Sequence, residues 1–229
     1  VRRQAVMVLS KHPDIKHLMS LLKMRQETDA RDTHFMYSIR QALRDQLRDR
    51  GVRSHVLSKD WVENDLRTIL DVIIGVDDVD ASVFITRHLT LMDSTGAPLL
   101  NALKHAARFA KGSAEQSELV KKTQSLLPNN SFSQRALDGM VEGFRTAGKT
   151  IPGEIHKWSA SLVQDVFSHG NALQGWACIP YLQRPYKVNP WRWIDTLYQD
   201  EKTSVLMSDA LGWQGTHTSI LKSPSFQLQ

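Results

Sequence analysis

Amphipathic helical periodicity constrains this chain more than any other feature of its sequence. From Val1 to about residue 170, apolar residues recur at spacings of three and four between short polar turns. Such spacing places the apolar side chains on one stripe of an α-helix. In the longest segment, 32–50, this stripe consists of Met36, Ile39, Leu43 and Leu47. The sequence therefore predicts a mainly α-helical fold over this range.

Turn signals divide the range into about nine expected helices. Gly51 and Gly75 are expected to end two of them, because glycine readily adopts the backbone conformation that follows a helix. Asp60 and Glu63 form a capping pattern that would start another helix and bury Val62. The first four helices are expected at about 1–11, 14–25, 32–50 and 60–74, and the other five are expected to begin near 77, 98, 113, 131 and 154.

The spacing of these helices indicates a repeat architecture. Helix starts fall about 13 to 29 residues apart, so that helix pairs recur roughly every 40 residues. This period is typical of HEAT and armadillo repeats, in which helix pairs stack into an α-solenoid. Residues 1–170 are therefore predicted to form a HEAT-like α-solenoid. An irregular helical bundle is the alternative, since no helix pair copies another closely.

The composition changes after residue 170. Pro180, Pro185 and Pro190 recur at five-residue intervals, which prevents a long helix. Short β-like runs separated by glycine and proline follow. The sequence thus predicts a proline- and aromatic-rich linker over 171–195 and the beginning of a β-sandwich domain over 196–229.

Three tryptophans in and near this linker form a candidate aromatic contact. Trp176 lies before the three prolines, and Trp191 and Trp193 follow Pro190. Exposed indole rings can stack on sugars or nucleic-acid bases. The other interpretation is that they pack the linker onto the last helix and cover the open end of the solenoid.

Composition limits the possible classes of protein. The chain has 229 residues, of which 41% are hydrophobic and 23% charged, as in a folded globular protein. No apolar run approaches the ~18–20 residues that a membrane-spanning helix needs. Cys178 is the only cysteine, which excludes an internal disulfide and a cysteine-rich zinc site. Because the chain begins inside a helical pattern, we expect it to be part of a longer protein.

The net charge of +5 is unevenly distributed. Residues 1–60 carry 13 Lys/Arg and 7 Asp/Glu, a balance of +6, whereas residues 61–100 carry 2 and 7, a balance of −5. A basic region of this kind can meet a polyanion. Acidic residues interleave the basic ones, however, which is also typical of an ordinary solvated helix surface.

Arg40, Arg44 and Arg48 form the candidate interaction surface. They step by four along one face of the helix expected at 32–50. A row of guanidinium groups can clamp a phosphate or a carboxylate. The alternative is a solvated stripe, with the arginines paired to Asp45 and Asp49 at helical spacings.

No catalytic or metal-binding pattern emerges from the sequence. The nine histidines include no His-Glu-x-x-His spacing, and neither a nucleophile elbow nor a glycine-rich phosphate loop is present. Asp77, Asp78 and Asp80 lack the pattern of a calcium loop and suit a helix N-terminus better. His88 lies on an apolar stripe and is expected in the core, and His105 is expected to face a neighbouring helix. We therefore expect no enzyme, no metal and no cofactor within this chain.

Four segments resemble, in the same order, parts of a known family. They are 32–47 (DTHFMYSIRQALRDQL), 84–89 (FITRHL), 105–109 (HAARF) and 215–228 (GTHTSILKSPSFQL). They resemble the HEAT-repeat segment of large exported bacterial proteins of the membrane-bound dehydrogenase and c-type cytochrome kind. In that family the repeats lie between a β-propeller-like region and a haem module. The resemblance implies an extracytoplasmic location.

The family's haem attachment site has no counterpart here. It requires Cys-x-x-Cys-His, whereas Cys178 is followed by Ile-Pro-Tyr-Leu. We therefore carry no catalytic residue over from the family. Together, the helical periodicity and the resemblance predict a non-catalytic scaffold that positions neighbouring domains of the same chain or a protein partner, an electron-transfer haem domain among them. The alternative is a basic α-solenoid that binds nucleic acid.

Overall fold

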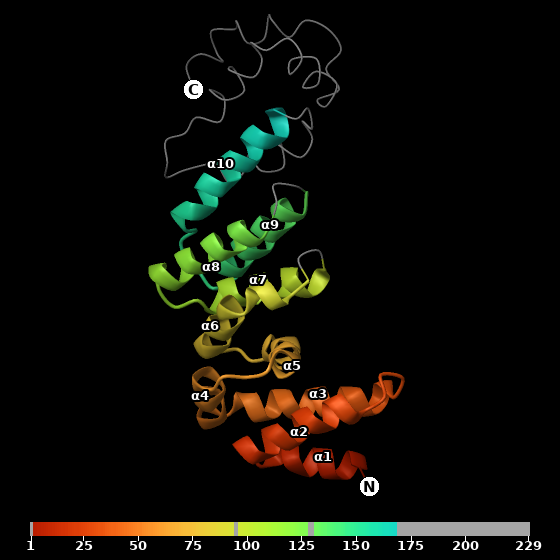
Figure 1. Ribbon diagram of the computed structural model, residues 1–229. Coiled ribbons are helices and arrows are strands. Elements are labelled where there is room, and N and C mark those ends of the chain that lie inside the picture. The colour runs from red at the N-terminus through yellow and green to blue at the C-terminus, as the bar shows by residue number, and fades with distance from the viewer. Residues whose placement is uncertain (1, 94–95, 128–130, 169–229) are drawn as a thin grey trace, which may run out of the picture. The chain divides into compact units, whose positions relative to one another are not determined.

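The computed structural model describes residues 2–93, 96–127 and 131–168, and this part of the chain is mainly helical (Figure 1). The predicted helical class is confirmed, and these residues include no strand. The expected linker over 171–195 and the β-sandwich over 196–229 lie outside the described residues. The elements are α1 (Arg2–Lys11), α2 (Ile15–Glu27), α3 (Thr33–Arg48), α4 (Arg50–Ser58), α5 (Glu63–Ile73), α6 (Val79–Arg87), the short 3-10 helix η1 (Leu89–Leu91), α7 (Ala97–Phe109), α8 (Ser113–Leu126), α9 (Ser131–Thr146) and α10 (Gly153–Ser168).

The chain divides into two compact units. The first comprises Val1–Leu126 with Gly139–Thr150, and the second comprises Leu127–Asp138 with Ile151–Gln229. In the second unit, α10 buries Ile155, Trp158 and Leu162, which lie three and four residues apart on one helix face. None of the helices in the described ranges is long and apolar enough to cross a membrane.

Helix α3 is the centre of the first half of the first unit. It packs against α1, α2, α4 and α5. The predicted stripe is confirmed, since Ile39, Leu43 and Leu47 are fully buried and Met36 is 9% exposed. The Asp32 carboxylate accepts a hydrogen bond from the Phe35 amide at 3.0 Å and so fixes where the helix begins.

Helix α4 was not expected, because Gly51 was predicted to end the preceding helix. Gly51 lies inside α4 instead. The helix break falls on Asp49, whose amide donates to the Gln46 carbonyl behind it and whose side chain accepts from the Val52 amide ahead of it at 3.0 Å. One aspartate therefore ends α3 and starts α4, and the described part of the chain has ten α-helices rather than nine.

The expected capping pattern at Asp60 is also wrong. Helix α5 begins at Glu63, three residues later, and its N-cap residue Val62 makes no side-chain cap. Val62 therefore stands outside the helix and is 67% exposed rather than buried. The other end follows the prediction, since α5 ends at Ile73 just before Gly75.

A pair of glycines brings α9 close to α7 within the first unit. A Cβ atom on Gly143 would overlap the Lys104 carbonyl oxygen, and one on Gly139 would lie 3.4 Å from the Leu100 carbonyl oxygen. Gly148 follows the end of α9 with a φ of +66°, a backbone conformation that glycine adopts without strain. The turn then directs the Lys149 ammonium to the last carbonyl groups of α7, where it donates to the Ala110 oxygen at 2.6 Å.

Candidate functional site

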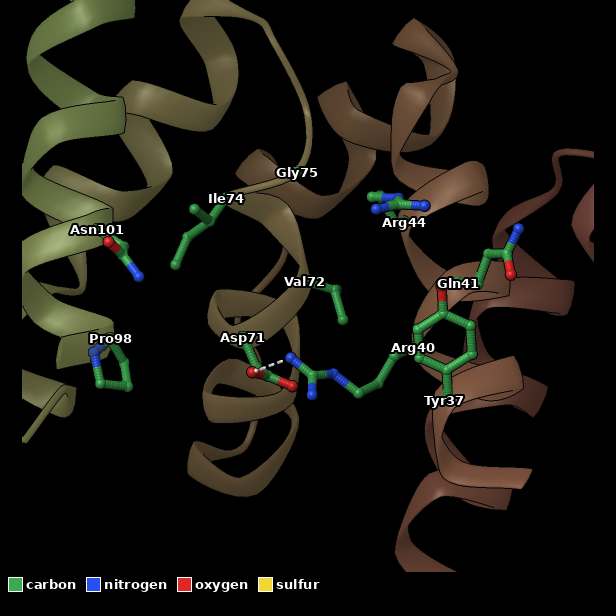
Figure 2. Close-up of a pocket in the computed structure, with 10 residues that line it drawn as sticks. All are labelled: Tyr37, Arg40, Gln41, Arg44, Asp71, Val72, Ile74, Gly75, Pro98 and Asn101. Carbon is green, nitrogen blue, oxygen red and sulfur yellow. Dashed lines mark hydrogen bonds and ion pairs between the residues drawn. The ribbon is translucent and has the colours of Figure 1, made fainter. Parts of the chain in front are cut away.

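A groove of about 430 Å³ lies between α3, α5 and α7 (Figure 2). We call it the α3–α5–α7 groove. Side chains three and four apart on α3 share its face, which places one wall of the groove on that helix. The lining residues are Tyr37, Arg40, Gln41 and Arg44 from α3, Asp71, Val72, Ile74 and Gly75 from α5 and the turn after it, and Pro98 and Asn101 from α7.

The structure separates the three predicted arginines. Arg40 and Arg44 line the α3–α5–α7 groove, whereas Arg48 borders a smaller hollow of about 260 Å³. Arg48 pairs with Asp45 at 3.0 Å, as the solvated-stripe alternative expects. Arg40 instead reaches across to Asp71 of α5 at 2.8 Å (Figure 2). Both members of this pair are nearly half exposed, so the pair contributes about 1 kcal/mol or less.

Arg44 differs from its two neighbours on α3. Its guanidinium makes no hydrogen bond or ion pair with any other described residue, and its Nε atom is covered by protein without an acceptor. A covered donor without a partner costs about 1–3 kcal/mol. Gly75 makes room for this side chain, because a Cβ atom at that position would overlap Cδ of Arg44.

The turn between α5 and α6 (residues 74–78) forms one end of the groove and is fixed from two other helices. His105 of α7 contacts the Val76 carbonyl oxygen through Nε2 at 3.1 Å. Arg53 of α4 donates to the Asp78 carboxylate at 2.7 Å. Asp78 in turn caps α6 by accepting from the Asp80 amide at 2.8 Å, which confirms the predicted role of this acidic cluster at a helix N-terminus.

Burial favours the neutral form of His105. It is 9% exposed, and burial lowers the pKa of its imidazole, although the Val76 carbonyl and the Asp77 carboxylate raise that pKa. A neutral imidazole donates from Nε2 to the Val76 carbonyl oxygen. The prediction that His105 faces a neighbouring element is confirmed. His88 is half-buried at the end of α6, with its ring 4.6 Å from that of Phe84, so it lies at the edge of the core.

The chemistry of the groove suits binding. Tyr37 presents a ring that is 67% exposed, and Val72, Ile74 and Pro98 add apolar surface. Gln41 and Asn101 offer amides that both donate and accept hydrogen bonds. The charged groups, which are two arginines and Asp71, leave a net charge of +1. Within residues 2–93, 96–127 and 131–168, no cluster of three or more His, Cys, Asp or Glu side chains could hold a metal ion.

Sequence reasoning found part of this groove. Tyr37 and Gln41 lie seven and three residues before Arg44, so helical spacing alone could have added them to the predicted surface. Asp71 and Asn101 come from other helices, and only the packing of those helices brings them near. Trp176, Trp191 and Trp193, the candidate aromatic contact, lie outside the described residues.

No protein-family model matches this chain, and neither a curated protein nor a solved structure matches it. The resemblance to exported dehydrogenase and cytochrome proteins therefore stays a prediction.

Proposed function

We propose that this chain is a non-catalytic helical-repeat scaffold, which holds a protein partner or neighbouring domains against its helix faces. One observation carries the proposal: buried polar side chains fasten the connections between consecutive helices. A stack fastened in this way keeps its surface features at constant separations. Constant separation is what a spacer or an interaction surface requires.

Gln46 illustrates the fastening at the first connection. This fully buried side chain of α3 accepts from the Asp14 amide at 2.8 Å and donates to the Leu9 and His12 carbonyl groups. It therefore satisfies three backbone groups at the turn between α1 and α2. Leaving such groups unmet costs about 1–3 kcal/mol each, so the turn has little freedom to open.

The same device recurs along the first unit. Arg53 donates to the Leu47 carbonyl at 3.0 Å, behind the α3–α4 connection. Ser82 donates from α6 to the Ala106 carbonyl of α7 at 2.8 Å. Lys149 donates to the carbonyl groups that end α7. These contacts join α3 to α4, α6 to α7, and the turn after α9 to α7, and they support a rigid stack.

A distance measurement within the first unit tests the scaffold proposal. Spin labels are placed by Ser20→Cys on α2 and Lys121→Cys on α8, both exposed, in the full chain carrying Cys178→Ser. Pulsed electron resonance should give one narrow distance distribution. As a matched control, adding Gln46→Leu should broaden it, because the first turn loses its fastening. A broad distribution in the chain without Gln46→Leu would contradict the proposal.

Nucleic-acid binding is the second candidate, favoured by the charge of +6 on residues 1–60. The side chains argue against a continuous basic track, because Arg31, Arg40 and Arg48 each pair with an aspartate. Binding of a 20-nucleotide single strand is measured against salt concentration. Affinity that falls steeply with salt, with a slope reduced by replacing Arg40, Arg44 and Arg48 together, would favour this candidate.

A further inference from the structure

We propose that the α3–α5–α7 groove binds a carboxylate side chain of an extended peptide segment from a partner protein, with Arg44 as the residue that receives it. The inference rests on the proposed scaffold function, because a fixed stack is what keeps Arg44 in place. It goes further by naming the site and the chemistry of the ligand.

Arg44 has hydrogen-bonding capacity that no described residue uses. A guanidinium group offers five donors in a planar fork that matches the two oxygens of a carboxylate. The neighbouring cations are already occupied, since Arg40 binds Asp71 and Arg48 binds Asp45. Of the two arginines in the groove, only Arg44 has no acceptor among the described residues, and its terminal nitrogens, unlike its Nε, are not covered by protein. An anionic ligand supplies that acceptor.

The charge of the groove favours a monoanion. Its lining carries Arg40, Arg44 and Asp71, a net charge of +1. This balance matches one monoanion, whereas Asp71 opposes the second charge of a phosphate group. The sequence over 61–100, which supplies α5 and the start of α7, carries a balance of −5 and is unfavourable to a nucleic-acid backbone.

The other lining residues suit the peptide on either side of the acidic residue. Tyr37, Val72 and Pro98 provide apolar surface for a side chain next to the acidic residue. The amides of Gln41 and Asn101 provide partners for peptide N–H and C=O groups, which an extended segment leaves unpaired. A volume of about 430 Å³ is within the range of ligand pockets.

Two terminally blocked pentapeptides test the inference on the full chain. One has a glutamate between two leucines, and the other has glutamine in its place. Binding is followed by two-dimensional NMR of the Arg44 Nε–H group and of the Gly75 and Asn101 amides. We expect the glutamate peptide to bind about tenfold or more tightly than the glutamine peptide, since a hydrogen bond to a charged group is lost in the latter. Equal affinity of the two peptides, or no binding of either, would overturn the inference.

Matched variants assign the effect to Arg44. Arg44→Gln should abolish the preference for glutamate, whereas Arg48→Gln, which removes the same charge from the same helix outside the groove, should leave it unchanged. Gly75→Ala is the second variant, because it displaces the Arg44 side chain without removing its charge. Gly75→Ala should weaken the preference for the glutamate peptide. It tests the role of Arg44 even if Arg44→Gln does not fold. Loss of the preference in Arg48→Gln, or its persistence in both groove variants, would contradict the assignment.

Inorganic phosphate and a 20-nucleotide single strand serve as competing probes. The glutamate peptide should perturb the groove resonances at lower concentration than phosphate at equal ionic strength. Tighter binding of phosphate, or displacement of the peptide by the oligonucleotide at physiological salt, would replace the carboxylate by a phosphate ligand. Failure of this inference is distinct from failure of the scaffold proposal, since the spin-label distances are measured without any ligand.

Discussion

Two arginines from neighbouring helices, Arg44 in the α3–α5–α7 groove and Arg53 beneath the α5–α6 turn, use the same side chain differently. Arg53 is buried and donates to two carbonyl groups and to the Asp78 carboxylate, while its Nε lies 3.8 Å from an oxygen of Asp80. Arg44 has a covered Nε and no partner among the described residues. The Nε atom of each arginine is covered and has no hydrogen-bond partner, but the terminal nitrogens of Arg53 are bound within the protein, whereas those of Arg44 bind no described residue. Arg53 therefore stabilises the fold, whereas Arg44 is left to bind a ligand.

The largest expected effect comes from removing the buried arginine. Arg53→Met should lower the free energy of unfolding by about 3 kcal/mol, because it leaves Asp78 without its cation and two carbonyl groups without donors. Arg44→Met should instead raise that free energy by about 1 kcal/mol, because it removes a covered donor that has no partner. Urea unfolding of both variants measures the contrast. Equal losses of stability would show that the two arginines do not differ in this way.

A pair of glycine variants sharpens the same contrast. A Cβ on Gly143 meets the backbone of α7, which cannot move without displacing the helix, so Gly143→Ala should cost about 2 kcal/mol. A Cβ on Gly75 meets only the unpaired Arg44 side chain, which can move into the groove. Gly75→Ala should therefore cost less than about 1 kcal/mol. The midpoints of thermal unfolding compare the two, and a larger loss for Gly75→Ala would mean that Arg44 is held more firmly than its contacts indicate.

The predictable part of the fold is the part that repeats along the sequence. The stripe of Ile39, Leu43 and Leu47 follows from spacing alone, because apolar residues three and four apart can be buried only on one face of a helix. Helix boundaries were harder where two signals competed. Gly51 indicated the end of a helix. Asp49, two residues earlier, instead ends α3 and starts α4, and Val52 and Val56 are buried on the face of α4.

The candidate site was predictable only in part, for a physical reason. The arginine row on α3 was visible in the sequence, yet what each arginine does depends on the helix opposite. Asp71 neutralises Arg40 across the groove, and Gly75 leaves space beside Arg44. Asp71 and Gly75 each lie about 30 residues after the arginine that they affect. Periodicity describes one helix at a time. It therefore does not predict which charged side chain is left without a partner once the helices have packed together.

Acid should weaken the Arg53 region through His105, the imidazole that holds the same turn. Burial places the pKa of His105 below its ordinary value of 6.5. As the pH falls through 6.5 toward the lowered pKa, the unfolded chain binds a proton that the folded chain does not, so stability decreases and then levels off below the folded pKa. Burial lowers the pKa of His88 in the same direction, so both histidines contribute.

Urea unfolding at pH 7.5 and pH 5.5 measures this loss of stability. His105→Gln keeps a donor for the Val76 carbonyl but does not titrate, so its loss between the two pH values should be smaller than that of the unaltered chain. An unchanged loss in His105→Gln would mean that other groups account for the acid sensitivity. The effect should be smaller than that of Arg53→Met, because the hydrogen bond is retained at neutral pH.

Asp71→Asn should have only a small effect on stability, and it tests the charge of the groove. The Arg40–Asp71 pair is exposed, so its loss should cost about 1 kcal/mol or less. The substitution raises the charge of the lining from +1 to +2 and releases Arg40 beside Arg44. Two free guanidinium groups suit a dianion, so the affinity for inorganic phosphate should rise about two- to fivefold at low salt.

Asp45→Asn, which releases Arg48 outside the groove, is the matched control and should leave the affinity of the groove for phosphate unchanged. An equal gain in both variants would mean that net charge alone attracts the anion, whereas a gain confined to Asp71→Asn would show that Asp71 sets the preference of the α3–α5–α7 groove for a single negative charge.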